Sequence, residues 1–290
     1  MSEPDALHLH PAHLRRLAEN ALMEDEAWHD VTTAALVPPE QEGRGVIVAK
    51  AEGVLAGLPM AEAVFKAVDP SLAWRPLAAD GARISPGEAL AKVEGPLAAI
   101  LRAERVALNY LTHLSGVATA TARLVEAVAG TSCRLRDTRK TTPGLRTLEK
   151  YAARVGGGEN HRFTLADAVL IKDNHLAALR ARDLDIADAV RLAREAAPAE
   201  MRVQIEVTSV EEAREALAAG AHELLLDNMP PEEMRQVVDL AKGKAVLEAS
   251  GGITLANARR VAETGVDYIS VGAITHSAPA LDLSLELEPT

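Results

Sequence analysis

Beyond residue 130, short apolar runs alternate regularly with amphipathic stretches. The apolar runs have the length of buried strands, and the stretches between them repeat apolar residues every three or four positions, as a helix with one buried face does. The predicted strands are 134–138, 168–172, 203–207, 223–227, 245–249 and 268–272. The predicted helices are 145–155, 186–197, 210–219, 231–241 and 255–264.

The first 130 residues have a more mixed pattern. Apolar positions at helical spacing predict a helix over 7–24. Runs bounded by glycine and proline predict short strands at 46–57, 74–81 and 89–95. A long helix is expected from Pro96 into the 120s, with a break at Gly116.

Alternation of strands and helices indicates a parallel sheet covered by helices, and therefore an α/β fold. Six strands with short connections favour a closed or nearly closed barrel. An open, doubly wound sheet is the alternative. No G-x-G-x-x-G follows a first strand, which argues modestly against a dinucleotide-binding fold.

Composition narrows the class of protein. The chain is acidic, with a formal net charge of -11, and only 2% of its residues are aromatic, so a nucleic-acid partner is not expected. There is no apolar run of membrane-spanning length and no apolar signal core near the N-terminus, so neither a membrane protein nor a secreted one is expected. Cys133 is the single cysteine, which suits a reducing cytoplasm.

One stretch of this acidic chain, 137–175, gathers positive charge. It contains Arg139, Lys140, Arg146, Lys150, Arg154, Arg162 and Lys172, together with His161 and His175. A local excess of cations raises the concentration of anions at that place, so the stretch predicts an anion pocket.

In a (β/α) barrel the reactive groups lie at the carboxyl ends of the strands. The successive predicted strands end on Arg139 and Lys140, on Lys172 to His175, on Glu206, on Asp227 and Asn228, on Ser250 to Gly252, and on Gly272. A full ring of such strand ends predicts a single active site at this end of the barrel.

Two glycine turns predict a phosphate site. The first, 250–254, follows a strand and precedes a helical pattern, and the second is 270–277. Backbone N–H groups in such turns, with a helix start, bind phosphate without a charged side chain. Turns on the last two strands of a barrel are the usual place for it.

Arg139, Arg162 and Lys172 are candidates for carboxylate recognition, with His161 as an added donor. Lys172 follows an apolar run, where a lysine is costly without a partner or a function. Glu206 and Asp227 are expected to hold a divalent metal, ribose hydroxyls or a developing positive charge. The alternative is a structural ion pair with Lys140 or Lys172. The remaining basic residues at four-residue spacing, Arg146, Lys150 and Arg154, are expected to form a solvated or subunit-facing ridge.

The strings RKTTPGLRTLEKYA, GGGENHR, LIKDNH, LLLDNM, LEASGGI and GVDYISVGAITHS closely resemble the quinolinate phosphoribosyltransferase family (nicotinate-nucleotide pyrophosphorylase, carboxylating). The resemblance covers nearly the whole chain. It implies an N-terminal α/β sandwich domain over 1–115, to which a strand near 281–288 returns, and an incomplete α/β barrel of phosphoribosyltransferase type II over 116–280. It also implies a homodimer or a larger assembly of dimers, such as a hexamer.

The resemblance implies the reaction as well. Quinolinate and 5-phosphoribosyl 1-pyrophosphate would give nicotinate mononucleotide, pyrophosphate and carbon dioxide, with Mg2+, in NAD biosynthesis. Quinolinate would be held by Arg139, His161, Arg162 and Lys172, with Arg105 donated by the partner subunit. The sugar donor would be held by Lys140, Glu206, Asp227, Ser250, Gly251, Gly252, Gly272 and His276, with the metal at Glu206 and Asp227. Thr138 would also bind substrate. Lys140, Lys172, Glu206 and Asp227 would carry the catalysis.

Two positions depart from the family pattern. His29 replaces the glycine before Asp30, and Gln204 replaces an acid two residues before Glu206. The first raises a question about an N-terminal loop and the second about metal affinity. Three other functions remain: a Schiff-base aldolase using Lys172 or Lys140, a non-catalytic sensor of a phosphoribosyl ligand, and a relative that uses nicotinate.

Overall fold

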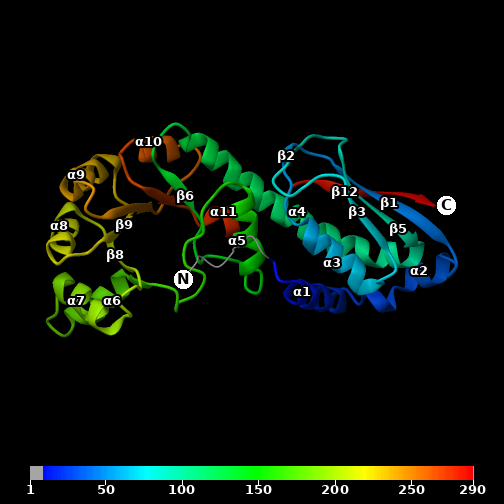
Figure 1. Ribbon diagram of the computed structural model, residues 1–290, viewed down its shortest axis with the longest axis horizontal. Coiled ribbons are helices and arrows are strands. Elements are labelled where there is room, and N and C mark those ends of the chain that lie inside the picture. Colours follow the sequence, from blue (N-terminus) through cyan, green and yellow to red (C-terminus); the bar gives the residue numbers. More distant parts are fainter. Residues whose placement is uncertain (1–8, 290) are drawn as a thin grey trace. The chain divides into compact units, whose positions relative to one another are not determined.

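The computed structural model of the chain describes residues 9–289 (Figure 1). It divides into two compact units. Within the described residues, unit 1 comprises 9–122, 142–157 and 277–289, and unit 2 comprises 123–141 and 158–276.

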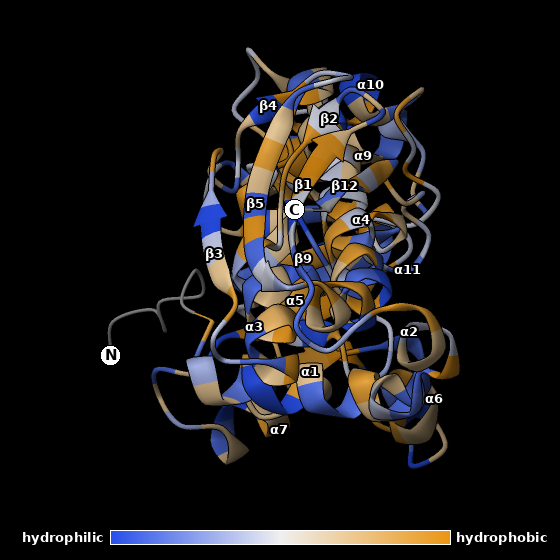
Figure 2. Cartoon of the chain, turned by 90° about the vertical axis from the view of Figure 1, so that its right-hand side faces the viewer, coloured by the Kyte–Doolittle hydropathy of each residue, from blue (hydrophilic) through white to orange (hydrophobic). Residues whose placement is uncertain are grey.

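Unit 1 is built on an antiparallel sheet with the strand order β12-β1-β5-β3. Its strands are β1 (Glu42–Ala49), β3 (Ala73–Pro76), β5 (Ala89–Pro96) and β12 (Leu283–Pro289). β12 pairs with β1 from Gly43↔Pro289 to Ala49↔Leu283, so the last residues of the chain belong to this unit. β3 is an exposed edge strand, and its arrowhead is accordingly hydrophilic in Figure 2. A separate pair, β2 (Gly53–Val54) and β4 (Arg83–Ile84), makes a short ladder.

The helices of unit 1 are α1 (Pro11–Glu24), the 3-10 turn η1 (Ala27–His29), α2 (Val31–Leu36), α3 (Leu58–Val68), most of α4 (Leu97–Val128) and α5 (Arg146–Val155). α1 packs against α3. Residues 7 and 8 of the helix predicted over 7–24 lie outside the described residues. The run predicted as a strand over 46–57 divides instead into the end of β1, a turn and β2.

The predicted break at Gly116 is wrong, because α4 continues through it. A Cβ at Gly116 would lie 2.2 Å from the carbonyl oxygen of Pro279. This glycine therefore permits a close approach between a helix and a neighbouring backbone segment within unit 1, and does not end the helix.

The prediction that the basic residues of α5 form a solvated ridge is wrong for Lys150. Lys150 and its neighbour Glu149 are fully buried, and Tyr151 is 7% exposed. Tyr151 donates a 2.6 Å hydrogen bond to Asp80, so α5 is covered on more sides than its apolar stripe suggests.

Unit 2 is a six-stranded parallel sheet with the order β6-β11-β10-β9-β8-β7. The strands are β6 (Arg134–Arg136), β7 (Val169–Ile171), β8 (Val203–Val207), β9 (Glu223–Asp227), β10 (Val246–Ser250) and β11 (Tyr268–Ser270). The helices are α6 (Asp173–Arg180), α7 (Ile186–Ala196), α8 (Val210–Ala218), α9 (Pro231–Ala241), α10 (Ala258–Ala262) and α11 (Ala273–His276).

Sequence neighbours among these strands pair with one another, and β11 returns to β6, but no ladder joins β6 to β7 in the described part of the chain. Glu159 makes a parallel bridge to Arg136, so the segment before β7 lies along β6 at the open edge. This order confirms the predicted incomplete barrel and excludes a doubly wound sheet, whose strand order would reverse. Across residues 9–289, no helix is both long and apolar enough to cross a membrane.

Candidate active site

A cavity of about 450 Å³ opens at the carboxyl ends of the strands of unit 2. Thirteen of the residues expected in the site line it: Thr138, Arg139, Lys140, His161, Arg162, Lys172, Glu206, Asp227, Ser250, Gly251, Gly252, Gly272 and His276. The exception is Arg105, which is exposed on α4 in unit 1 and is not among the lining residues. At least one residue from each predicted strand end thus lines a single cavity, whereas Asp173, Asn174, His175 and Asn228 are not among its lining residues.

The loop after β6 is held from two sides. The Lys140 amide donates a 3.0 Å hydrogen bond to Thr138 Oγ1, and Thr275 Oγ1 donates a 2.7 Å hydrogen bond to the Lys140 carbonyl. A Cβ added at Gly272 would lie 2.9 Å from Cδ of Lys140. Gly272 therefore lets the Lys140 side chain cross the β11 turn.

Arg162 is a buried cation, only 7% exposed, and its Nη1 donates to the Ala168 carbonyl at 2.8 Å. Burial lowers the pKa of Arg162, and the charge of Arg139 lowers it further, against a smaller opposing effect of Asp167. Nε of Arg139 is buried and has no hydrogen-bond partner.

Within residues 9–289, no carboxylate pairs with Arg139, Lys140 or Arg162. Lys140 is exposed, but Arg139 is half-buried and Arg162 is buried, and buried cations that are close together are costly unless an anion joins them. The wall formed by these three residues can therefore bind a polyanionic ligand, and the guanidinium forks match carboxylates.

Lys172 was predicted inside a buried strand, and the structure corrects this. It follows β7 as the N-cap residue of α6, a helix that the polar sequence DNH concealed, and its side chain is 46% exposed. Its Nζ lies 3.2 Å from Oε2 of Glu206, whose side chain is 8% exposed. The lysine thus spans the mouth between the ends of β7 and β8.

Asp227 ends β9 beside Ser250 of β10, and its Oδ2 accepts a 2.8 Å hydrogen bond from the Asn228 side chain. Glu206 and Asp227 offer carboxylate oxygens from adjacent strands. Among the described residues, no three His, Cys, Asp or Glu side chains gather as a metal site. Two carboxylates suit Mg2+, which commonly binds one or two of them with waters and substrate phosphates.

The turn after β10 is shaped by its glycines. Gly251 has φ +87°, and a Cβ there would lie 2.3 Å from Oδ1 of Asn228, so a side chain would not fit. Gly252 also has a positive φ, +60°. The helix predicted over 255–264 is shorter, because α10 begins only at Ala258, so the turn's own backbone lines the cavity without a helix start beside it.

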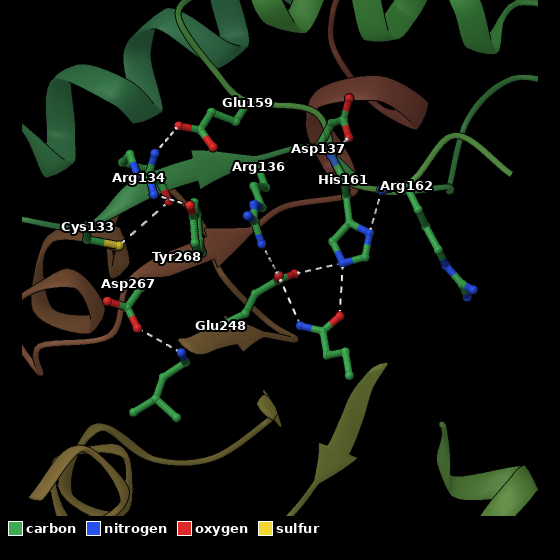
Figure 3. A network of polar contacts seen from close by, with 12 residues as sticks. Cys133, Arg134, Arg136, Asp137, Glu159, His161, Arg162, Glu248, Asp267 and Tyr268 are labelled. Atoms are coloured by element: carbon green, nitrogen blue, oxygen red, sulfur yellow. Dashed lines mark hydrogen bonds and ion pairs between the residues drawn. The ribbon is translucent and has the colours of Figure 1, made fainter. Parts of the chain in front are cut away.

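Glu248 lines the cavity and is fully buried on β10. Its Oε2 accepts hydrogen bonds from Arg136 Nη1 at 3.0 Å and from Gln204 Nε2 at 3.2 Å (Figure 3). Arg136 also stacks 3.2 Å above the centroid of the Tyr268 ring. Sequence reasoning missed Glu248, although a charge inside the apolar run AVLEA is the same signal that drew attention to Lys172.

Position 29, where the sequence departs from the family pattern, needs no glycine for its backbone conformation. His29 ends η1 and does not have a positive φ. Asp30 caps α2 by accepting hydrogen bonds from the amides of Thr32 and Thr33, each 3.0 Å. Asp30 also accepts from the Thr33 hydroxyl, and these bonds lower its pKa.

Two family models match the chain: "Quinolinate phosphoribosyl transferase, N-terminal domain" over residues 30–115 and "Quinolinate phosphoribosyl transferase, C-terminal domain" over residues 117–286. The "Nicotinate-nucleotide pyrophosphorylase [carboxylating]" of Mycobacterium leprae is 44% identical over 94% of this chain and 96% of its own. The human protein of the same name is 41% identical over 97% and 94%. The crystal structure of NadC from Streptococcus pyogenes superposes with a TM-score of 0.92 at 40% identity, covering 98% of this chain and 99% of that one.

Proposed function

Because the chain belongs to the quinolinate phosphoribosyltransferase family, we propose that it transfers the phosphoribosyl group of 5-phosphoribosyl 1-pyrophosphate to quinolinate. Decarboxylation follows, and the products are nicotinate mononucleotide, pyrophosphate and carbon dioxide, in NAD biosynthesis. The lone, buried Cys133, whose pKa burial raises to about 12, is compatible with a cytoplasmic enzyme.

The observation that carries this proposal is the set of cavity cations without carboxylate partners. Quinolinate has two carboxylates, and the sugar donor has a phosphate and a pyrophosphate, so together they supply the anions that Arg139, Lys140 and Arg162 lack. Arg139, Arg162 and Lys172 would receive the two carboxylates, with His161 beside them. Ser250 and the glycines of the two turns, with His276, would receive the 5-phosphate.

The reaction needs positioning and electrostatics more than acid–base chemistry. Pyrophosphate leaves the anomeric carbon as positive charge develops on the ribose, and the pyridine nitrogen forms the new bond from the opposite face. Glu206 and Asp227 stabilise the developing positive charge and hold the ribose hydroxyls. Once the ring nitrogen is quaternary, the adjacent carboxylate leaves as carbon dioxide, and the ring carbon takes a proton from solvent.

Glu206 and Asp227 are also the residues we propose for Mg2+. When bound, the ion would supply positive charge to neutralise the leaving pyrophosphate. Lys172 already offsets part of the charge of Glu206, so the remaining ligands would be substrate oxygens and waters.

We propose a homodimer in which Arg105 of one subunit completes the cavity of the other. The support is that Arg105 is exposed on α4 and does not line the cavity. Mixing Arg105→Ala chains with Arg162→Ala chains should restore activity, because each heterodimer would keep one intact composite site. A purified heterodimer as inactive as its parents would contradict shared sites.

The function is tested by product stoichiometry. With both substrates and Mg2+, nicotinate mononucleotide, pyrophosphate and carbon dioxide should form in equal amounts. Binding without products would indicate a sensor. Trapping of a carbonyl compound on Lys172 or Lys140 by borohydride would indicate an aldolase.

A further inference from the structure

His161 has both ring nitrogens engaged by the protein. Its side chain is 12% exposed, and the ring lies between the backbone of Arg162 and the side chain of Glu248 (Figure 3). The side chain of Gln204 also contacts the ring. The hydrogen-bonding capacities of these neighbours determine which nitrogen carries a proton, because a neutral imidazole has one donor and one acceptor.

The Nδ1 atom faces a donor. The backbone N–H of Arg162 donates to Nδ1 of His161 at 2.8 Å. A proton on Nδ1 would point at this N–H group, so Nδ1 carries its lone pair and no hydrogen. The other end of the segment is fixed as well, since the His161 amide donates to Asp137 Oδ1 at 2.8 Å.

The Nε2 atom faces acceptors. It lies 3.1 Å from Oε1 of Gln204 and 3.4 Å from Oε1 of Glu248. The orientation of the Gln204 amide follows from chemistry: Glu248 carries no donor when ionised, so the NH2 of Gln204 faces it and the amide oxygen faces His161. Nε2 must therefore hold the ring proton.

An acid at position 204 would not make this arrangement, because a carboxylate cannot donate to Glu248. In this chain the amide both donates to Glu248 and accepts from His161, while Arg136 supplies the charge that faces Glu248. The four side chains come from β6, β8, β10 and the segment before β7, so the network joins the open edge of the barrel to its centre.

We propose that Gln204 and Glu248 hold His161 as the neutral Nε2–H tautomer, so that His161 is a positioning residue for Arg162 and not a donor to a bound carboxylate. The pocket then recognises its ligand through Arg139, Arg162 and Lys172, and His161 fixes the backbone from which Arg162 extends. The assignment of the tautomer depends only on the geometry of the site. The conclusion that His161 does not donate to the substrate carboxylate rests on the proposed function.

The tautomer is tested by nitrogen-15 NMR of the protein labelled at its histidine rings, at neutral pH and without substrate. The signals of His161 are assigned by their loss in His161→Gln. We expect Nε2 to show a directly bonded proton and Nδ1 to show none. A ring protonated on both nitrogens, or on Nδ1 alone, overturns the proposal whatever reaction the enzyme catalyses.

The positioning role is tested with Glu248→Gln and Gln204→Met, each checked for a native circular-dichroism spectrum. We expect the KM for quinolinate to rise by roughly tenfold or more, by analogy with residues that orient a metal ligand, whose loss lowers metal affinity or activity by about 10- to 100-fold. The KM for the sugar donor should change by less than about twofold, because the side chains of Gln204 and Glu248 contact each other, Arg136 and His161, and none of these contacts is to a residue proposed to hold the sugar donor. If a variant fails to fold, His161→Gln serves as the second test, since its amide can still donate toward Gln204.

An equal rise in both KM values would indicate general damage and reject the positioning role. Retention of wild-type KM for quinolinate in a folded Glu248→Gln protein would also reject it. If no variant and no wild-type sample turns over quinolinate, the proposed function fails, and the NMR result still decides the tautomer.

Discussion

Lys172 and Glu206 form a 3.2 Å ion pair across the ends of two neighbouring strands, with the lysine half exposed and the glutamate buried. An ion pair with one exposed partner contributes little to stability. A cation held at the mouth of an anion-binding cavity is better explained by function, and this difference can be measured.

Lys172→Ala should lower kcat/KM for quinolinate at least tenfold, through loss of one charge-assisted contact. The free energy of unfolding should fall by no more than about 1–3 kcal/mol, because the truncation leaves the buried Glu206 carboxylate without its cation, while water screens the exposed lysine side of the pair. Steady-state kinetics and urea unfolding on the same preparation measure the two effects. A loss of stability that parallels the loss of activity would show that the pair is structural.

Arg162→Ala should lower kcat/KM about 10- to 100-fold, because a hydrogen bond to a charged group contributes about 1.5–3 kcal/mol. Arg162→Lys should recover only part of the loss, since an ammonium keeps the charge but not the bidentate fork. Arg180→Ala is the matched control: Arg180 pairs with Glu212 on the surface at 2.9 Å, outside the cavity. Near-normal activity of Arg162→Ala would show that Arg162 does not bind the substrate.

Gly116→Ala should destabilise the protein by about 1–3 kcal/mol, as overpacking against a backbone carbonyl does. Helix propensity alone predicts the opposite sign, a gain of up to about 1 kcal/mol. Ala120→Gly, at a half-buried position of the same helix, calibrates the propensity term. Chemical denaturation of both variants separates the explanations, and a more stable Gly116→Ala protein would contradict the close approach to Pro279.

The acid stability of the protein should depend on Glu149. Burial acts to raise its pKa, but hydrogen bonds from His113 at 2.9 Å and from the Thr142 amide at 3.0 Å leave it below the ordinary value of 4.5. A carboxyl whose pKa is lowered by folding stabilises the protein above that ordinary value, and loses this effect as the pH falls through the lowered value.

Glu149→Gln should therefore be less stable than the wild type near pH 6, and the difference should shrink as the pH falls below 4.5. Urea unfolding over this pH range gives the result, with Glu94→Gln at an exposed position as the control. A difference that stays constant across the range would show that the Glu149 carboxylate does not stabilise the fold through its charge.

The sequence predicted the positions of strands and helices correctly where the apolar residues repeat with a regular period. β8, β9 and α9 lie at the predicted residues because each has a strong apolar pattern and clear end signals, such as Pro231. α6 was missed because its first residues, DNH, are polar and resemble a loop. Lys150 was misplaced because a helix periodicity identifies one buried face and cannot reveal that a second face is also covered.

The candidate site was predictable as a set of strand ends, since topology alone brings the carboxyl ends of parallel strands together. The hydrogen bonds between side chains within the site were not predictable from the sequence. No spacing rule joins Glu248 to Gln204, 44 positions away, because their contact depends on strand order and side-chain direction within the barrel.

The central claim is that cavity cations without carboxylate partners select a pyridine with two carboxylates. Its most direct test is the ratio of kcat/KM for quinolinate to that for nicotinate, measured with the same sugar donor and with carbon dioxide release followed in parallel. We predict a ratio of at least about 10³, because leaving buried charged groups without their partners costs several kcal/mol. Equal turnover of the two acids, or quinolinate turnover without carbon dioxide, would contradict the account.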